Sequence, residues 1–223
     1  MTTDSTDAGQ ALIADPAVPD PTVPDASATA ILDAASRRFL HYGYNKTTMS
    51  EIAADCNMSP GNLYRYYPSK LDIAEGFVRR LRSDHLAELR AAALPAGLST
   101  PERLRTYFRT KLRLAYDRFH DRPKAYELSQ EILKERASFA TEWEAAEARI
   151  IEDILSRGAA AGDLNLPDRA RLARLLQDVF FRFTTSAIFF EGDYEGLVGE
   201  LDAVMDLVLD AFAWRHSGLV RGA

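Results

Sequence analysis

Hydrogen-bonding side chains are concentrated in the segment SPGNLYRYYPSK, residues 59–70. Ser, Asn, Tyr, Arg and Lys are the residue types that contact the phosphate oxygens and base edges of DNA. The segment holds no pairing of a nucleophile with a base, and no two carboxylates that could divide acid and base roles. The chemistry that it predicts is therefore nucleic-acid binding rather than catalysis.

The preceding residues, TTMSEIAADCNMS (47–59), predict a helix and a sharp turn that would position this segment. Thr47 or Thr48 can cap the helix, and Glu51 lies three residues after Thr48, which is the spacing of a capping box. Asn57 stands where the chain must turn, and Asn tolerates the left-handed backbone conformation. The apolar stripe that would face a core consists of Met49, Ile52 and Ala53.

A second helix is predicted to begin after Ser59, which can cap it, with Pro60 in the first turn. Gly61 costs about 1 kcal/mol relative to Ala in a helix, so a bare position there suggests close approach to DNA. Leu63 would anchor the helix to the core. Similar caps and turns occur in helical proteins that never bind DNA, so the pattern by itself remains a hypothesis.

From about Thr29 to Arg80 the chain resembles the TetR family of transcriptional regulators. The resemblance rests on ILDAASRRFLHYGY (31–44), TTMSEIAADCNMS (47–59) and GNLYRYYPSK (61–70). Cys56 and Asn57 depart from the Ala-Gly that is frequent in the family, and Tyr67 replaces the more usual Phe. The resemblance implies an all-α fold of nine helices. It also implies a three-helix helix-turn-helix domain over residues 27–72 and a helical effector-binding and dimerisation domain over residues 73–223.

The same resemblance implies a recognition helix at about Ser59–Tyr66 that enters the major groove. We expect Asn62 and Arg65 to lie near bases, while Pro60 and Gly61 allow the close approach. The side chains expected to grip phosphates are Thr48, Ser59, Tyr64, Tyr66 and Lys70.

The net charge of −6 is unevenly distributed along the chain. Residues 1–26 contain five Asp and no Lys or Arg, and their Pro-rich sequence predicts a disordered tail. Residues 27–82 contain eight Lys or Arg against five Asp or Glu, so the predicted DNA-binding segment is the basic part of an acidic protein.

Periodic apolar residues and helix-start signals predict further helices over 70–93, 100–120, 122–134, 137–161, 167–191 and 194–214. The last two are apolar over a wide arc, which indicates burial of more than one side. An ordinary monomeric core would explain this, but a two-fold dimer would also double the base contacts of one reading head. We therefore expect a homodimer on a palindromic operator.

Aromatic side chains are scattered between the predicted head and the last two helices. In the family this region encloses a small-molecule pocket, and aromatic walls with hydroxyl groups suit an apolar or aromatic effector. Such residues also commonly fill a helical core. The candidate lining residues are Tyr107, Phe108, Tyr116, Phe119, Tyr126, Phe139, Trp143, Phe180 and Thr184.

The sequence lacks a metal-binding motif, a Gly-rich phosphate loop and a nucleophile elbow, and its four His are far apart. We expect no enzyme activity, cofactor, metal site or membrane span, and a cytoplasmic location, since a signal peptide is not evident. The function predicted is a repressor released from DNA by an effector. The alternatives are an effector-independent DNA-binding or protein-interaction dimer with a packed body and, less favoured, an enzyme with an appended DNA-binding head.

Overall fold

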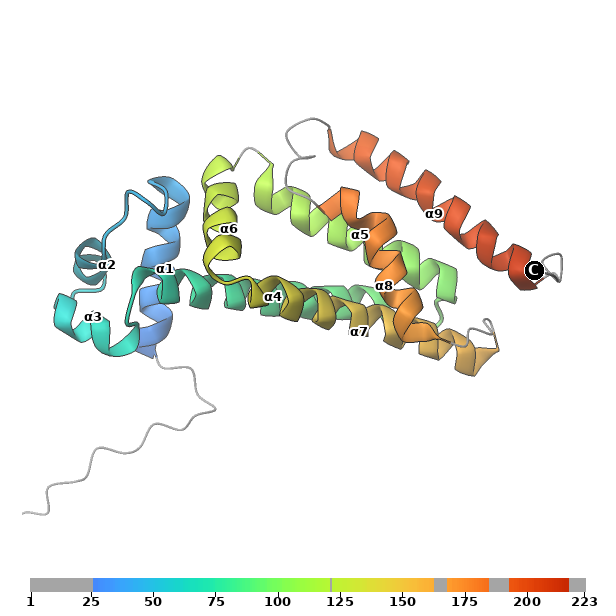
Figure 1. Ribbon diagram of the computed structural model, residues 1–223, viewed down its shortest axis with the longest axis horizontal. Coiled ribbons are helices and arrows are strands. Elements are labelled where there is room, and N and C mark those ends of the chain that lie inside the picture. The colour runs from blue at the N-terminus through green and yellow to red at the C-terminus, as the bar shows by residue number, and fades with distance from the viewer. Residues whose placement is uncertain (1–25, 121, 163–167, 185–192, 217–223) are drawn as a thin grey trace, which may run out of the picture.

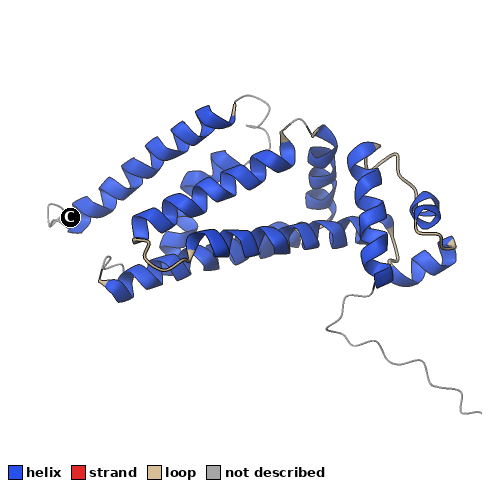
Figure 2. Cartoon of the chain, turned by 180° about the vertical axis from the view of Figure 1, so that it is seen from behind, coloured by secondary structure: helices blue, strands red, loops and turns tan. Residues whose placement is uncertain are grey.

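The computed structural model describes residues 26–120, 122–162, 168–184 and 193–216, and the side chains of 212–216 lie outside that description. These residues form nine α-helices and one short 3-10 helix, with helices and loops alone in the described parts of the chain (Figure 2). The elements are α1 (Ala26–His41), α2 (Met49–Asp55), α3 (Pro60–Tyr66), α4 (Lys70–Ala93), α5 (Thr100–Phe119), α6 (Pro123–Glu135), α7 (Ser138–Ala161), α8 (Arg169–Phe180), η1 (Phe181–Thr184) and α9 (Tyr194–His216).

The molecule has a small head and a larger body, joined by the long helix α4 (Figure 1). Helices α1, α2 and α3 form the head, and α4 runs from it along the body beside α7. Helix α6 stands between the two parts and contacts α1, α4 and α5. The body is completed by α5, α8 and α9, with α9 packed along α5.

Side-chain caps fix where most helices of the head begin. The hydroxyl of Thr48 accepts the N–H of Glu51, whose carboxylate accepts the N–H of Thr48, so the predicted capping box is present. Ser59 accepts the N–H of Asn62, with Pro60 at the first helical position. These local bonds satisfy N–H groups that a helix start leaves open.

The apolar core of the head extends beyond the predicted domain boundary at residue 72. Buried side chains of α1, α2 and α3 pack against Phe77 of α4, and also against Leu128 and Ile132 of α6 and Phe139 of α7. A three-helix head has too few apolar side chains to enclose a core by itself. The core of the head is therefore completed by residues of α6 and α7, which lie more than fifty positions after α3 in the sequence.

The body has a separate apolar core, formed by α4, α5, α7, α8, η1 and α9. Ion pairs from Arg105 and Arg109 to Asp202 hold α9 against α5. The helix predicted over 167–191 instead ends as α-helix at Phe180 and tightens into η1, and residues 185–192 lie outside the described residues. The predicted tail, residues 1–26, also lies outside them apart from Ala26, which begins α1.

Helices α8 and α9 leave apolar side chains uncovered on one copy of the chain. Val179 is 49% exposed, Phe181 is 61% exposed and Leu207 is 72% exposed. The remaining apolar residues of these helices that face α5 and α7 are buried or half-buried. One side of each helix is thus packed within the chain and another is open to a partner.

Candidate DNA-binding surface and internal cavity

The helix-turn-helix is held by its turn and by two buried anchors. Asn57 has a φ of 54°, the left-handed conformation predicted for it. The N–H of Met58 donates to the carbonyl of Ala53 at 3.0 Å, which folds the chain back between α2 and α3. Ile52 and Leu63 are completely buried and fix the relative position of the two helices.

The outer face of α3 presents the predicted DNA contacts. Ser59, Pro60, Gly61, Tyr64 and Arg65 are exposed, and a Cβ added at Gly61 would meet no atom within 4 Å. No neighbour within the chain therefore requires a glycine at this position.

Two other predicted contacts are half-buried. Asn62 lies on the flank of α3, and Tyr66 packs partly against the core of the head. The structure thus leaves part of each side chain accessible from the face of α3.

Two predicted phosphate-binding side chains are occupied within the protein. The hydroxyl of Thr48 donates to Glu51 at 2.7 Å. The ammonium of Lys70 donates to the carbonyls of Tyr44 and Thr47 at 2.8 and 2.9 Å and lies 4.3 Å from the centroid of the Tyr44 ring. Burial lowers the pKa of Lys70. Two of its three N–H donors therefore hold the loop that precedes α2, and its contact with phosphate stays a prediction.

Sequence reasoning missed Arg38, which ties the helix-turn-helix to α1. Its guanidinium donates to both carboxylate oxygens of Asp55 at 2.6 and 2.9 Å and pairs with Glu51 at 3.2 Å. The hydrogen bond from Arg38 lowers the pKa of Asp55. The sequence shows a cation in α1 and two acids in α2, but it does not show that α1 packs against α2. The pairing could therefore be recognised only in the structure.

The body contains a cavity of about 1200 Å³, bounded mainly by α4, α5, α6, α7 and α8. Phe119, Trp143 and Thr184, three of the predicted pocket residues, line it. Charged side chains that were not predicted from the sequence also line it: cationic Arg82, Lys111, Arg118, Arg149, Arg171 and Arg174, and anionic Glu144, Glu147, Glu152 and Asp178. The wall therefore combines apolar surface with charged side chains that the predicted aromatic lining did not include.

The other six predicted pocket residues do not line this cavity. Tyr107, Phe108 and Phe180 are almost completely buried in the core of the body, and Phe139 is buried in the core of the head. Tyr116 packs partly buried against the body core, stacked on His120, and Tyr126 is half-buried on α6. Aromatic side chains at helical spacing fill the cores here, which was the competing interpretation.

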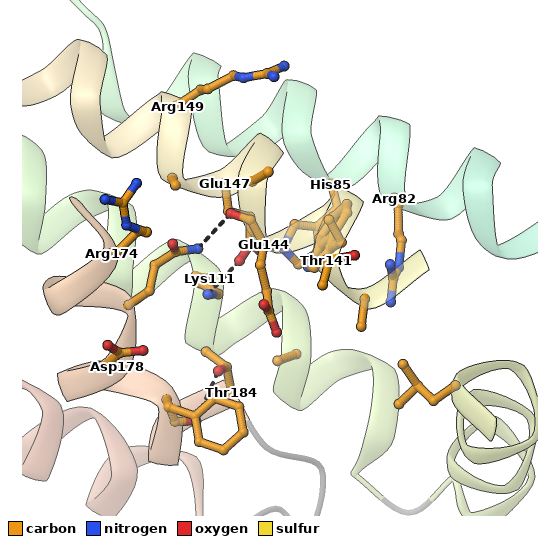
Figure 3. A pocket seen from close by; sticks show the side chains of 18 of the residues that line it. Arg82, His85, Lys111, Thr141, Glu144, Glu147, Arg149, Arg174, Asp178 and Thr184 are labelled. Carbon is orange, nitrogen blue, oxygen red and sulfur yellow. Dashed lines mark hydrogen bonds and ion pairs between the residues drawn. The ribbon is translucent and has the colours of Figure 1, made fainter. Parts of the chain in front are cut away.

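A group of buried charges occupies one side of the cavity (Figure 3). The ammonium of Lys111 lies 2.6 Å from one carboxylate oxygen of Glu147, and these side chains are 10% and 2% exposed. His85 lies beside them, with its Nε2 3.8 Å from the other oxygen of Glu147. Burial, reinforced by the charges of Arg118, Lys111 and other cations, lowers the pKa of His85 to about 3, so the imidazole is neutral and forms no ion pair.

The tautomer of His85 follows from its neighbour Arg118. A guanidinium nitrogen of Arg118 lies 3.1 Å from Nδ1 of His85, and a guanidinium can only donate. The imidazole proton is therefore on Nε2, which has no hydrogen-bond partner, and neither has the facing Oε1 of Glu147.

Arg82 connects the cavity to the head. Its guanidinium donates to the carbonyl of Phe139 at 3.0 Å and lies 3.9 Å from the centroid of the Phe139 ring and 4.7 Å from that of Trp143. Its Nε is buried without a partner, and burial lowers the pKa of Arg82 to about 10. Arg82 thus lines the cavity while holding a residue of the core of the head.

The described residues contain neither a candidate membrane-spanning helix nor a candidate metal-binding cluster. None of their helices combines the length and apolar character needed to cross a membrane. Within the same ranges, no three His, Cys, Asp or Glu side chains are grouped so that they could hold a metal ion.

Comparisons with known proteins match both parts of the chain. A family model described as "Bacterial regulatory proteins, tetR family" matches residues 31–76, and one described as "Tetracyclin repressor-like, C-terminal domain" matches residues 100–205. The chain is 45% identical over 40 residues to the uncharacterized HTH-type transcriptional regulator YuxN of Bacillus subtilis (strain 168). That match covers 18% of this chain and only 14% of the length of YuxN.

Solved structures share the fold over most of the chain. Thermus thermophilus FadR, a TetR family transcriptional repressor in complex with lauroyl-CoA, is 25% identical, with a TM-score of 0.60 over 88% of this chain and 97% of that one. The fatty acid degradation regulator FadR of Bacillus halodurans is 20% identical, with a TM-score of 0.59 over 84% and 96%. A transcriptional regulator from Cytophaga hutchinsonii is 22% identical, with a TM-score of 0.62 over 84% and 98%.

Proposed function

Because the chain belongs to the TetR family of bacterial regulatory proteins, we propose that it is a homodimeric transcriptional repressor. It binds a palindromic operator and is released when a small-molecule effector enters the cavity of the body. The observation that carries the proposal is the pairing of a capped, exposed recognition helix with a large cavity, partly open to solvent, in one chain.

The DNA-reading role rests on the outer face of α3. Asn62 and Arg65 reach base edges, Gly61 lets the helix backbone approach the groove, and the exposed Ser59 and Tyr64 contact phosphates. The buried Leu63 anchors this helix to the core of the head, and the Arg38–Asp55 pair joins the preceding helix α2 to α1.

The dimer is supported by uncovered apolar side chains of α8 and α9, Val179 and Leu207. Large apolar side chains exposed this strongly are typical of association surfaces. A second copy packed on them would set two reading heads at a fixed spacing, as a palindromic site requires.

The effector proposal rests on the volume and the wall of the cavity. About 1200 Å³ is larger than most drug-sized ligand pockets. Phe119, Trp143 and Phe181 offer apolar contacts, but the buried charges opposite them call for a polar group as well. Lauroyl-CoA, the ligand of the Thermus relative, is an apolar chain with an anionic carrier, and acyl-CoA thioesters are reasonable first candidates.

Coupling between the cavity and DNA would run through the corner between α6 and α7. Leu128 and Ile132 of α6 belong to the core of the head, whereas Ser129 and Leu133 of the same helix line the cavity. A ligand that shifts α6 therefore disturbs the packing of the head. It can act as an effector only if it binds one arrangement more tightly than the other.

The first experiment is selection of genomic DNA fragments by the purified protein, followed by binding measurements with and without acyl-CoA thioesters. Recovery of a palindrome, and weaker binding to it with an acyl-CoA, are expected. Failure to enrich any DNA sequence, with or without ligands, would contradict the proposal. Binding that no ligand alters would favour the alternative, an effector-independent dimer.

A pair of substitutions separates base reading from phosphate binding. Asn62→Ala should weaken binding to the recovered operator by about 1–3 kcal/mol and leave binding to random DNA unchanged. Tyr64→Phe removes only a hydroxyl group and should weaken both kinds of DNA to a similar extent. Fluorescence anisotropy with operator and scrambled duplexes measures both. Equal losses on the two duplexes for Asn62→Ala would contradict its base-reading role.

A further inference from the structure

The inner end of the cavity carries more positive than negative charge. Arg82, Lys111 and Arg118 line it, and Glu147 is the buried acid among them. Lys111 already pairs with Glu147 at 2.6 Å. Arg82 and Arg118 therefore remain as two guanidinium groups that lack a carboxylate within salt-bridge distance among the described residues.

Both guanidinium groups are half-buried, and holding a cation there without an opposite charge is costly even with the hydrogen bonds that each makes. Burial lowers the pKa of both Arg82 and Arg118, and the charge of Arg118 lowers that of Arg82 further. Natural proteins rarely keep buried charges without an opposite charge unless a ligand supplies one. The same site holds buried polar atoms without a partner, including the Nε of Arg82 and the Nε2 of His85, and His85 is 5% exposed.

We propose that the effector carries a carboxylate or a similar organic anion, which binds at the inner end of the cavity against the guanidinium groups of Arg82 and Arg118. This inference rests on the proposed sensor function, because it names the chemistry of the ligand for the same cavity. The neutral imidazole of His85 leaves the site positive without adding a charge that varies near neutral pH. An alkyl chain at this end would instead leave the polar groups buried without partners.

The geometry also limits where the apolar part of the effector lies. Trp143 and Phe119 line the cavity alongside the charged group, and Leu175 and Phe181 line it from α8 and η1. An effector with its anion at Arg82 would extend its apolar part toward these side chains. Figure 3 shows Arg149 pointing away from Lys111 and Glu147, so that this exposed cation is a matched control for the buried ones.

A test that needs no knowledge of the effector uses Trp143 as a reporter. Arg82 lies 4.7 Å from the Trp143 ring, so an anion held by Arg82 would quench its fluorescence. In a Trp214→Phe background, which leaves one tryptophan, iodide should quench Trp143 more strongly than neutral acrylamide does, relative to free tryptophan. Arg82→Gln should remove this excess and Arg149→Gln should keep it. Quenching by iodide no stronger than by acrylamide would overturn the proposal.

A second arm compares decanoate, decanol and decylammonium, which share one chain and differ in head group. Decanoate should bind at least about tenfold more tightly than decanol, since a hydrogen bond to a charged group is stronger than one to a neutral group, and decylammonium should not bind. Arg82→Gln and Arg118→Lys, the latter chosen because it keeps the charge in a buried position, should each weaken decanoate and leave decanol unchanged. Arg149→Gln should affect neither ligand. Equal binding of decanol and decanoate would overturn the proposal.

Operator release, measured in parallel, separates this inference from the proposed function. If decanoate binds at Arg82 but the protein stays on DNA with every ligand, the sensor function fails and the anion site stands. If an effector releases the operator equally well from wild type and from both arginine variants, the anion site fails and the sensor function stands.

Discussion

The core of the head and the core of the body differ in how completely their buried polar groups are paired. The buried side chains of the core of the head are apolar, and its one buried hydroxyl, that of Thr47, donates to the carbonyl of Gly43. Among the described residues, the buried side-chain polar atoms without a partner are those of Arg82, His85, Tyr107 and Glu147, and all of them lie in or beside the body. The core of the head is apolar and closely packed, whereas the body contains buried polar atoms without hydrogen-bond partners, most of them beside the cavity. Such groups commonly mark the place where a protein awaits a ligand.

The largest test of this contrast is the buried ion pair. Glu147→Leu should destabilise the protein by about 3–5 kcal/mol, because it leaves the ammonium of Lys111 buried without an anion. The double variant Glu147→Leu/Lys111→Met should recover most of that loss, since the charges are removed together. Urea unfolding measures both. If the double variant is as unstable as the single one, the loss of stability comes from altered packing rather than from the unpaired charge of Lys111.

The matching test of the head removes apolar volume. Leu63→Ala should cost about 3 kcal/mol, because the completely buried side chain cannot be replaced without leaving a cavity. Leu133→Ala, at a side chain that is 37% exposed, is the control and should cost less than about 1 kcal/mol. Thermal unfolding measures the loss of stability in both variants. Similar losses would show that the buried Leu63 contributes no more than the exposed Leu133.

The third test concerns pH. His85 is neutral when folded, with a pKa of about 3 against 6.5 when unfolded. The unfolded chain therefore binds more protons below pH 6.5, and stability falls as the pH falls through that value toward 3. Between pH 7 and pH 5 His85 should contribute a loss of about 2 kcal/mol. His85→Asn keeps an acceptor for Arg118 and should flatten this dependence in urea unfolding at the two pH values; an unchanged slope would contradict it.

The smallest expected effect separates folding from DNA binding within the head. Gly61→Ala should stabilise the protein by up to about 1 kcal/mol, since alanine favours the helix and the position is sterically open. The same methyl group should weaken operator binding if the helix backbone lies close to DNA. Calorimetry measures the change in stability of this variant, and fluorescence anisotropy measures the change in its affinity for the operator. A variant that gains stability and keeps full affinity would show that Gly61 is not at the interface.

The head could be predicted from the sequence because its signals are local. The capping box of Thr48, the cap of Ser59 and the left-handed Asn57 each depend on residues within a few positions, and each is present. The bounds of α4, residues 70–93, were predicted correctly, since Ser69 caps its start. The tightening of α8 into η1 was missed because no proline or glycine marks residue 180.

The cavity could not be predicted in the same way. Its charged wall brings together Arg82, Lys111 and Glu147 from three different helices, and nothing in their spacing relates them. Six of the aromatic residues predicted for the pocket do not line this cavity, since a periodic aromatic pattern fits a core as well as a pocket: Tyr107, Phe108, Tyr116, Tyr126, Phe139 and Phe180. The hydrogen bonds from Lys70 to Tyr44 and Thr47 were likewise not predicted, because the accepting carbonyls belong to a loop more than twenty positions earlier in the sequence.

The participation of α6 in the core of the head has a consequence for synthesis of the chain. Leu128, Ile132 and Phe139 emerge from a ribosome well after the reading helix is complete, yet the head encloses its core only with them. Contacts that span so much sequence slow folding and are formed late. The apolar core of the newly made head should therefore remain incomplete until more than half of the chain has been translated. A regulator cut short before α6 would then fail to bind DNA competently, so that premature termination does not leave a ligand-blind repressor on the operator.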